Sequence, residues 1–294
     1  MKRLLILVSA SVALFFLIAA CGSDPTITPA PTSIPAPTAT AVPQINQVSF
    51  KAVDYSFSGP ESIPAGMTGI TFVNEGQELH HQQLLTLPDG MTVDDFMAAL
   101  LSGEEGPPPP GVVGAGGVGA LNPGLSGSVT LNLAPGNYVI VCFVPNAEGV
   151  PHVALGMVKP LTVTEAIGPL AAEPASDVSI DLVDFGFGLS APISAGPQNI
   201  RVTNKGQQEH EAFLIQLDPG ATANDFMSAF GPDAPPGPPP GRGLGGFQAI
   251  ASGGGGTFTV DFAPGNYALV CFVEDPNTGA PHFALGMIHE FTVQ

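Results

Sequence analysis

The strongest constraint on this chain is an internal repeat. When residues 46–87 are laid on residues 176–217 without a gap, 15 of 42 positions are identical. Further on, PGNYVIVCF at 135–143 returns as PGNYALVCF at 264–272. Two stretches of about 120 residues therefore share one pattern, and each is long enough for a domain with its own core. Side chains that stay the same in both copies, while most neighbours differ, are candidates for function.

Short apolar segments separated by turn signals predict an all-β fold. In the first copy these segments are rich in β-branched and aromatic residues and lie at 48–57, 68–74, 82–87, 127–133, 136–143 and 155–163. Their number and spacing favour two tandem Greek-key β-sandwich domains with seven or eight strands each. We expect the domains at 46–165 and 177–294, joined by a linker at 166–176.

One short helix is expected to interrupt each sandwich. Both helices are preceded by a Thr-x-x-Asp capping box, formed by Thr92 and Asp95 in the first copy and by Thr222 and Asp225 in the second. Met97 and Met227 lie on these helices and are expected to pack in the core. The Gly- and Pro-rich segments that follow, 103–117 and 231–246, are expected to be mobile surface loops.

Four chemically distinctive side chains occur in the same order in both copies. They are His80, Cys142, His152 and Met157, and then His210, Cys271, His282 and Met287. A thiolate, two imidazoles and a weak thioether form the ligand set of a type 1 copper site. The pattern predicts one copper ion per repeat. In an exported protein, Cys142 and Cys271 could instead form a disulfide with each other or be two small buried hydrophobic residues.

The segments around the two cysteines resemble the cupredoxins, the plastocyanin and azurin family. That family has a Gly-x-Tyr-x-x-x-Cys strand, and this chain contains Gly136-Asn137-Tyr138-x-x-x-Cys142 and Gly265-Asn266-Tyr267-x-x-x-Cys271. The endings His152-x-x-x-Gly156-Met157 and His282-x-x-x-Gly286-Met287 resemble the end of plastocyanin. The resemblance implies that His80 and His210 are the upstream ligands. It also implies that the downstream histidines reach the surface through an apolar patch where a partner docks.

Two features depart from the family pattern. Nine residues separate Cys142 from His152 and ten separate Cys271 from His282, which is more than cupredoxins usually have. Such loops could admit water or bring a carboxylate to the metal, the candidates being Glu148, Glu274 and Asp275. The family also has an Asn after the upstream histidine, where this chain has His81 or Glu211. His81 and His289 each occur in one copy only and are expected to be surface residues.

The N-terminal residues predict export and lipidation. Lys2 and Arg3 precede an apolar run that ends in Ile18-Ala19-Ala20-Cys21, which has the form of a lipoprotein signal peptide at 1–20. Cys21 would become the lipidated N-terminus, and 21–45 would form a Pro/Thr-rich tether. We therefore expect the protein in a bacterial cell envelope, on the outer side of a membrane, in the periplasm or at the cell surface.

The net charge and the remaining motifs exclude some classes of function. The formal net charge is −18, and it becomes −20 once Lys2 and Arg3 leave with the signal peptide. This excludes nucleic acid as a partner and would steer a basic redox protein toward the chain. Two-domain copper oxidases and nitrite reductases need further histidines for a second copper centre, often as His-x-His. This chain contains no His-x-His motif. We therefore expect an electron carrier rather than an enzyme. The alternative is a copper-storing or metal-free binding module on the cell surface.

Replacing Cys21 with Ala should block lipidation and signal cleavage by the lipoprotein route, because the thiol is the acyl acceptor. Incorporation of a labelled fatty acid into the expressed protein measures the effect. An unchanged lipid label in Cys21→Ala would rule out this anchor.

Overall fold

The computed structural model describes residues 43–102, 109–230 and 236–294. The predicted signal peptide, Cys21 and most of the tether lie outside the described residues. In the described part, no helix combines the length and apolar character needed to cross a membrane.

The first copy contributes nine strands, of which all but β3 and β6 overlap the predicted segments. They are β1 (Asn46–Val53), β2 (Ser56–Ser58), β3 (Ser62–Pro64), β4 (Gly66–Asn74), β5 (His80–Leu87), β6 (Val113–Leu121), β7 (Ser126–Leu133), β8 (Gly136–Val141) and β9 (Val158–Thr164). The second copy contributes β10 (Val178–Val183), β11 (Gly186–Leu189), β12 (Gly196–Asn204), β13 (His210–Leu217), β14 (Gly241–Ile250), β15 (Gly255–Phe262), β16 (Gly265–Val270) and β17 (Ile288–Val293).

The strands form two sheets, each of which runs through both copies. One has the order β11-β10-β12-β15-β7-β4-β1-β2, and the other the order β17-β16-β13-β14-β6-β5-β8-β9-β3. Within each copy the chain passes repeatedly from one sheet to the other, as in a Greek-key sandwich. The all-β prediction is therefore confirmed.

The two sheets enclose one large apolar core. It contains residues of both copies, including the fully buried Phe72, Leu131 and Phe247. Burying a side chain such as Phe72 contributes about 1.5 to 3 kcal/mol. Cys142 and Cys271 also belong to this core, so the predicted ligands lie in an apolar surrounding.

Two helices lie on the outer face of the second sheet. α1 (Val93–Leu100) and α2 (Ala223–Ser228) begin after Thr92 and Thr222, and both predicted capping boxes are formed. Phe96 of α1 and Phe226 of α2 are buried against this face. Met97 and Met227 are partly buried in the same clusters. Because helices cover the outer face and the core covers the inner face, β5 is buried on both sides along almost its whole length.

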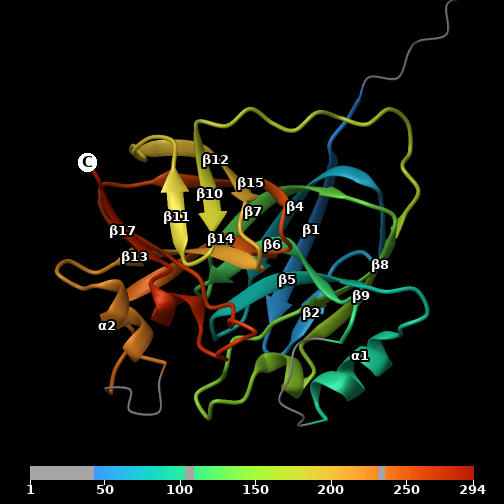
Figure 1. Ribbon diagram of the computed structural model, residues 1–294, viewed down its shortest axis with the longest axis horizontal. Helices are drawn as coiled ribbons and strands as arrows, with labels where there is room; N and C mark the ends of the chain where they lie inside the picture. Colours follow the sequence, from blue (N-terminus) through green and yellow to red (C-terminus); the bar gives the residue numbers. More distant parts are fainter. Residues whose placement is uncertain (1–42, 103–108, 231–235) are drawn as a thin grey trace, which may run out of the picture. The chain divides into compact units, whose positions relative to one another are not determined.

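The prediction of surface loops after the helices is wrong for most of their glycines. Val113–Leu121 and Gly241–Ile250 are the strands β6 and β14, and they are largely buried. They pair with each other, with Phe247 opposite Val118, and lie side by side between the two copies (Figure 1). Residues 103–108 and 231–235 of the predicted loops lie outside the described residues.

Glycine is needed in these strands because neighbouring backbones approach closely. A Cβ on Gly119 would overlap the carbonyl oxygen of Gly245 in the partner strand. A Cβ on Gly117, whose φ is 137°, would overlap the carbonyl oxygen of Gln82. A glycine-rich composition normally indicates a loop, but here it indicates strands whose backbones lie very close together.

The described residues of both copies form one compact unit by their contacts. Pairing of β7 with β15 joins the first sheet across the two copies, as β6 and β14 join the second. The predicted boundaries between two domains stay a prediction, because sheets and core continue through both copies.

Replacing Gly119 with Ala should lower the free energy of unfolding by about 1 to 3 kcal/mol, because the added methyl group must push β6 and β14 apart. Gly188→Ala in β11 is the control, since its Cβ would meet Asp181 only at an ordinary contact of 3.7 Å. Urea unfolding of both variants measures the difference. Equal midpoints for the two variants would contradict this account of the glycine strands.

Candidate metal centres

Strand pairing brings the upstream histidine and the cysteine of the first copy together. His80 begins β5 and Cys142 directly follows β8. The two strands are antiparallel neighbours, with Gln83 opposite Val141, so both side chains lie at the same end of the pair. The backbone N–H of His81 donates a 3.4 Å hydrogen bond to Cys142 Sγ.

The segment after the cysteine folds back and places the other two side chains. His152 begins the 3₁₀-helix η1 (His152–Leu155), and Val153 N–H donates to the Cys142 carbonyl at 2.8 Å. Met157 donates its N–H to the His152 carbonyl at 3.0 Å, and its carbonyl accepts from Cys142 N–H at 3.3 Å. The backbone thus ties three of the four predicted ligands to one another.

The second copy builds the same arrangement. His210 begins β13, Cys271 follows β16, and His282 begins η2 (His282–Leu285). Met287 N–H donates to the His282 carbonyl at 2.9 Å, and the Met287 carbonyl accepts from Cys271 N–H at 3.3 Å. All eight predicted side chains are fully buried, with 0% exposure.

Three ligand atoms converge at each centre. In the first, His80 Nδ1 lies 3.0 Å from His152 Nδ1, and Cys142 Sγ lies 3.9 and 3.5 Å from these nitrogens. In the second, His210 Nδ1 lies 3.0 Å from His282 Nδ1, and Cys271 Sγ lies 4.0 and 3.4 Å from them. Three atoms at such separations share a central point about 2 Å from each, close to the length of a metal–imidazole bond.

The hydrogen bonds of the two Nε2 atoms in the first centre indicate which ring nitrogens carry a proton. His80 Nε2 lies 2.6 Å from Asp54 Oδ1, and His152 Nε2 lies 2.8 Å from Glu78 Oε2. A carboxylate only accepts hydrogen bonds, so both Nε2 atoms carry the proton. Both Nδ1 atoms then point lone pairs at each other across 3.0 Å. Such an opposition is unfavourable unless a cation lies between them, so the residues fit a metal ion.

The acidic partners and burial shift several pKa values. Burial alone would raise the pKa of Asp54, but hydrogen bonds from His80 and from the N–H groups of Gln77 and Glu78 lower it overall. The hydrogen bond from His210 lowers the pKa of Asp184. Burial lowers the pKa of His152, which the bond to Glu78 partly opposes. Both aspartates are therefore charged acceptors at neutral pH.

Burial also controls the two thiols. It raises the pKa of Cys142 to about 12 and raises that of Cys271 as well. Neither cysteine is in a disulfide. Each thiol lies in its own cluster, which excludes the pairing of Cys142 with Cys271 in this structure. A metal ion would have to displace the thiol proton on binding.

The long loops leave the clusters intact. In the first, Asn146 N–H donates to the Val150 carbonyl, and Pro145 pairs with Pro151 at the base. In the second, Glu274 pairs with Pro281 in the same way. The extra residues therefore form a turn beyond the ligands. Among the described residues, each candidate cluster consists of two histidines and a cysteine, without a carboxylate.

The expectation that His81 is a surface residue is wrong. His81 is 6% exposed, and burial lowers its pKa to about 3, so the ring is neutral. Its Nε2 accepts a 2.8 Å hydrogen bond from the N–H of Phe143, the residue after Cys142. Glu211 accepts the equivalent bond from Phe272 N–H at 2.7 Å. These two residues therefore hold the segment that follows each cysteine. His289 is partly exposed in β17.

The expectation that the downstream histidines reach the surface is also wrong. His152 and His282 are fully buried, and their Nε2 atoms are covered by Glu78 and Gln208. The reason is a tertiary contact, because the segment before the upstream histidine folds over the ring of the downstream one. Sequence reasoning missed Asp54, Glu78 and their counterparts, although Asp54 returns as Asp184 in the repeat.

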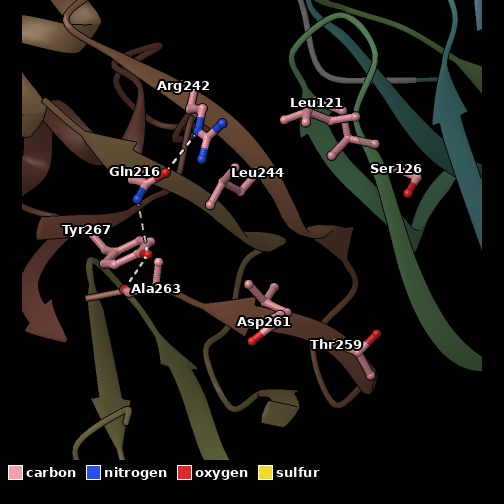
Figure 2. Close-up of a pocket in the computed structure, with 11 residues that line it drawn as sticks. Leu121, Ser126, Gln216, Arg242, Leu244, Thr259, Asp261, Ala263 and Tyr267 are labelled. Carbon is pink, nitrogen blue, oxygen red and sulfur yellow. Dashed lines mark hydrogen bonds between the residues drawn. The ribbon is translucent and has the colours of Figure 1, made fainter. Parts of the chain in front are cut away.

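Figure 2 shows a separate hollow of about 210 Å³, lined by residues such as Gln216, Arg242 and Tyr267. At its edge Arg242 Nε donates to Gln216 Oε1 at 2.8 Å, and Gln216 donates in turn to the Tyr267 hydroxyl at 3.3 Å. None of the eight predicted ligands lines it. It is therefore distinct from the candidate metal centres.

Searches of protein-family models and of curated proteins give no match to this chain. Among solved structures, it is similar to dithionite-reduced auracyanin from Roseiflexus castenholzii, at 20% identity over 42% of this chain and 99% of that chain, with a TM-score of 0.28. It is similar to auracyanin A, a "blue" copper protein from Chloroflexus aurantiacus, at 20% identity over 41% and 100%, with a TM-score of 0.30.

A blue copper oxidase from Nitrosomonas europaea is similar at 15% identity over 85% of this chain and 86% of that chain, with a TM-score of 0.25. At these TM-scores the likenesses carry no weight for function. The fold and the candidate centres stand on the topology and the distances given above. Those distances show two buried His/Cys/His groups that fit two type 1-like copper sites.

In the folded, metal-free protein, iodoacetamide should modify neither Cys142 nor Cys271 at neutral pH, because both thiols are buried and protonated. Unfolding in urea should expose both to the reagent, and Cys142→Ser should then take up one label fewer. Mass spectrometry counts the labels. Modification in the native state, or a disulfide between the two cysteines, would contradict the structure.

Proposed function

We propose that this protein carries single electrons through two type 1-like copper centres on the outer side of a bacterial membrane. The metal ligands would be His80, Cys142, His152 and Met157 in the first centre and His210, Cys271, His282 and Met287 in the second. Copper bound there would supply a one-electron couple. Lipid on Cys21 and the tether at 21–45 would hold the protein at the membrane.

The observation that carries this proposal is the pair of opposed imidazole lone pairs next to a buried thiol, present twice. In both copies the two Nδ1 atoms lie 3.0 Å apart, with the thiol 3.4 to 4.0 Å from them. A thioether, a thiolate and two imidazoles suit copper better than the harder metals. A dry, preformed site also changes little when the charge of the metal changes, as fast electron exchange requires.

Several residues would keep the ligands in place. Asp54 accepts from the ring of His80 and from the N–H of Gln77, so it joins the ligand to its own turn. Asn74 is fully buried, donates to the carbonyls of Glu78 and Leu121, and accepts from Gly76 N–H. This network would fix the ring orientation, as outer partners of metal ligands generally do.

The histidine inventory supports a carrier over a copper oxidase. The chain has six histidines, of which four belong to the two clusters. The other two are His81, which accepts a backbone hydrogen bond from Phe143, and His289 on β17. Neither copy therefore offers a second group of histidines for the additional copper centre that such an oxidase uses.

A basic redox protein is the partner that the charge favours. Three of the five basic residues after the signal peptide are in ion pairs with carboxylates, namely Lys51 with Glu75, Arg201 with Glu173 and Lys205 with Asp181. Phe143 and Phe272, directly after the cysteines, are 39% and 36% exposed. A partner could approach each centre over these apolar side chains, guided by the acidic surface.

The purified protein loaded with copper should bind two ions per chain and show an intense visible thiolate-to-copper band. The band should bleach on reduction and return on oxidation. Cys142→Ser should remove one copper ion and about half of the band, because it deletes one thiolate ligand. Metal analysis and optical spectroscopy measure both effects. A colourless protein that holds only Cu(I) would favour storage, and a failure to bind copper would favour a metal-free binding module.

A further inference from the structure

The two candidate centres differ in the group that contacts the downstream histidine. In the first, His152 Nε2 lies 2.8 Å from the carboxylate oxygen of Glu78. In the second, His282 Nε2 lies 2.8 Å from the amide oxygen of Gln208. These positions correspond in the repeat, so the geometry is kept while a full negative charge is exchanged for a neutral dipole.

A second residue near the downstream histidine also differs between the two copies. The Tyr55 hydroxyl donates a 2.9 Å hydrogen bond to the other oxygen of Glu78, and its ring centroid lies 4.8 Å from that of His152. The bond to Glu78 raises the pKa of Tyr55, which keeps the hydroxyl a donor at neutral pH. At the corresponding place, the ring of Phe185 lies 5.2 Å from that of His282 and has no hydroxyl. A carboxylate with its donor has thus been replaced by an amide without one.

The hydrogen bonds to the upstream histidine and to the cysteine are alike in the two centres. The upstream rings lie 2.6 Å from Asp54 and 2.9 Å from Asp184, and each cysteine accepts a backbone N–H at 3.4 Å. The hydrogen bonds to the upstream histidine and the cysteine are therefore shared, whereas the group at the downstream histidine differs.

We propose that Glu78 and Gln208 give the two centres different reduction potentials, with the first centre lower. The inference rests on the copper function proposed above. A carboxylate bonded to Nε2–H makes the imidazole a stronger donor and stabilises the more highly charged Cu(II). The amide of Gln208 does so much less. The second centre would therefore be reduced first, and the chain would hold one electron over a range of potential rather than gain two together.

Two other carboxyl groups near the second centre have to be controlled. Asp275 is buried, and its charge acts on His282. Glu211 is buried beside the second cluster, and burial raises its pKa to about 7. When ionised, it would bring its own negative charge near that centre. Each substitution is therefore compared with the parent potential of its own centre, in which Glu211 and Asp275 are unchanged.

The test measures each centre alone, in Cys271→Ser for the first and Cys142→Ser for the second, by redox titration of the visible copper band. Glu78→Gln should raise the Cu(I)/Cu(II) ratio of the first centre about tenfold at a fixed potential, which is about 59 mV for a one-electron couple. Gln208→Glu should lower the ratio of the second centre by a similar factor. An unchanged band position would show that the ligands themselves are intact.

Glu148→Gln is the matched control, because Glu148 is an exposed carboxylate in the loop of the first centre, and its backbone N–H donates to Asn146 Oδ1. Tyr55→Phe is a second probe that keeps Glu78. It should lower the ratio of the first centre, because the carboxylate loses a donor and concentrates its charge on His152.

The outcomes separate the two proposals. Equal potentials in the two centres, or a shift in Glu78→Gln no larger than in Glu148→Gln, would overturn the inference and leave the carrier function standing. Absence of a thiolate–copper band in the parent protein would overturn both. If Glu78→Gln fails to fold, Gln208→Glu and Tyr55→Phe test the same charge effect in the opposite direction.

Discussion

The close pairing of β6 with β14 is the contact on which the arrangement of both copies depends. It joins one sheet of the first copy to one sheet of the second. The pairing of β7 with β15 joins the other two sheets in the same way. Glycines make the pairing of β6 with β14 possible, since a Cβ on Gly119 would overlap the opposite backbone. The result is one apolar core that runs through both copies and contains both cysteines. Each candidate centre is therefore buried and held from several strands.

The same burial creates the chemistry of the centres. Imidazole lone pairs held 3.0 Å apart in a dry core would repel each other, and water has no room to separate them. Asp54 and Asp184 orient the upstream rings so that the inner nitrogens face the thiols. The repeat keeps this frame and varies the outer partners, with Glu78 replaced by Gln208 and His81 by Glu211. The geometry of the candidate ligands is thus set by residues that are the same in both copies, whereas the charge around them is set by residues that differ.

Much of the fold and of the ligand set was predictable from local sequence. Alternating apolar segments and two capping boxes predicted the strands and helices, since these signals act over a few neighbouring residues. The repeat made the candidate ligands visible, because the same side chains return at the same places, as Cys142 does in Cys271. The order of His, Cys, His and Met was enough to propose copper.

Only the tertiary structure decided which groups surround those ligands. Glycine-rich segments read locally as loops, yet β6 and β14 are buried strands, because close backbone approach is a property of two distant segments. His81 looked exposed and is buried, since Phe143 comes to it through strand pairing. Glu78 covers His152 from 74 residues away, which no spacing rule anticipates. The sequence by itself determined most of the strands and the types of the candidate ligands, whereas contacts between distant segments determined burial, proton positions and the different surroundings of the two centres.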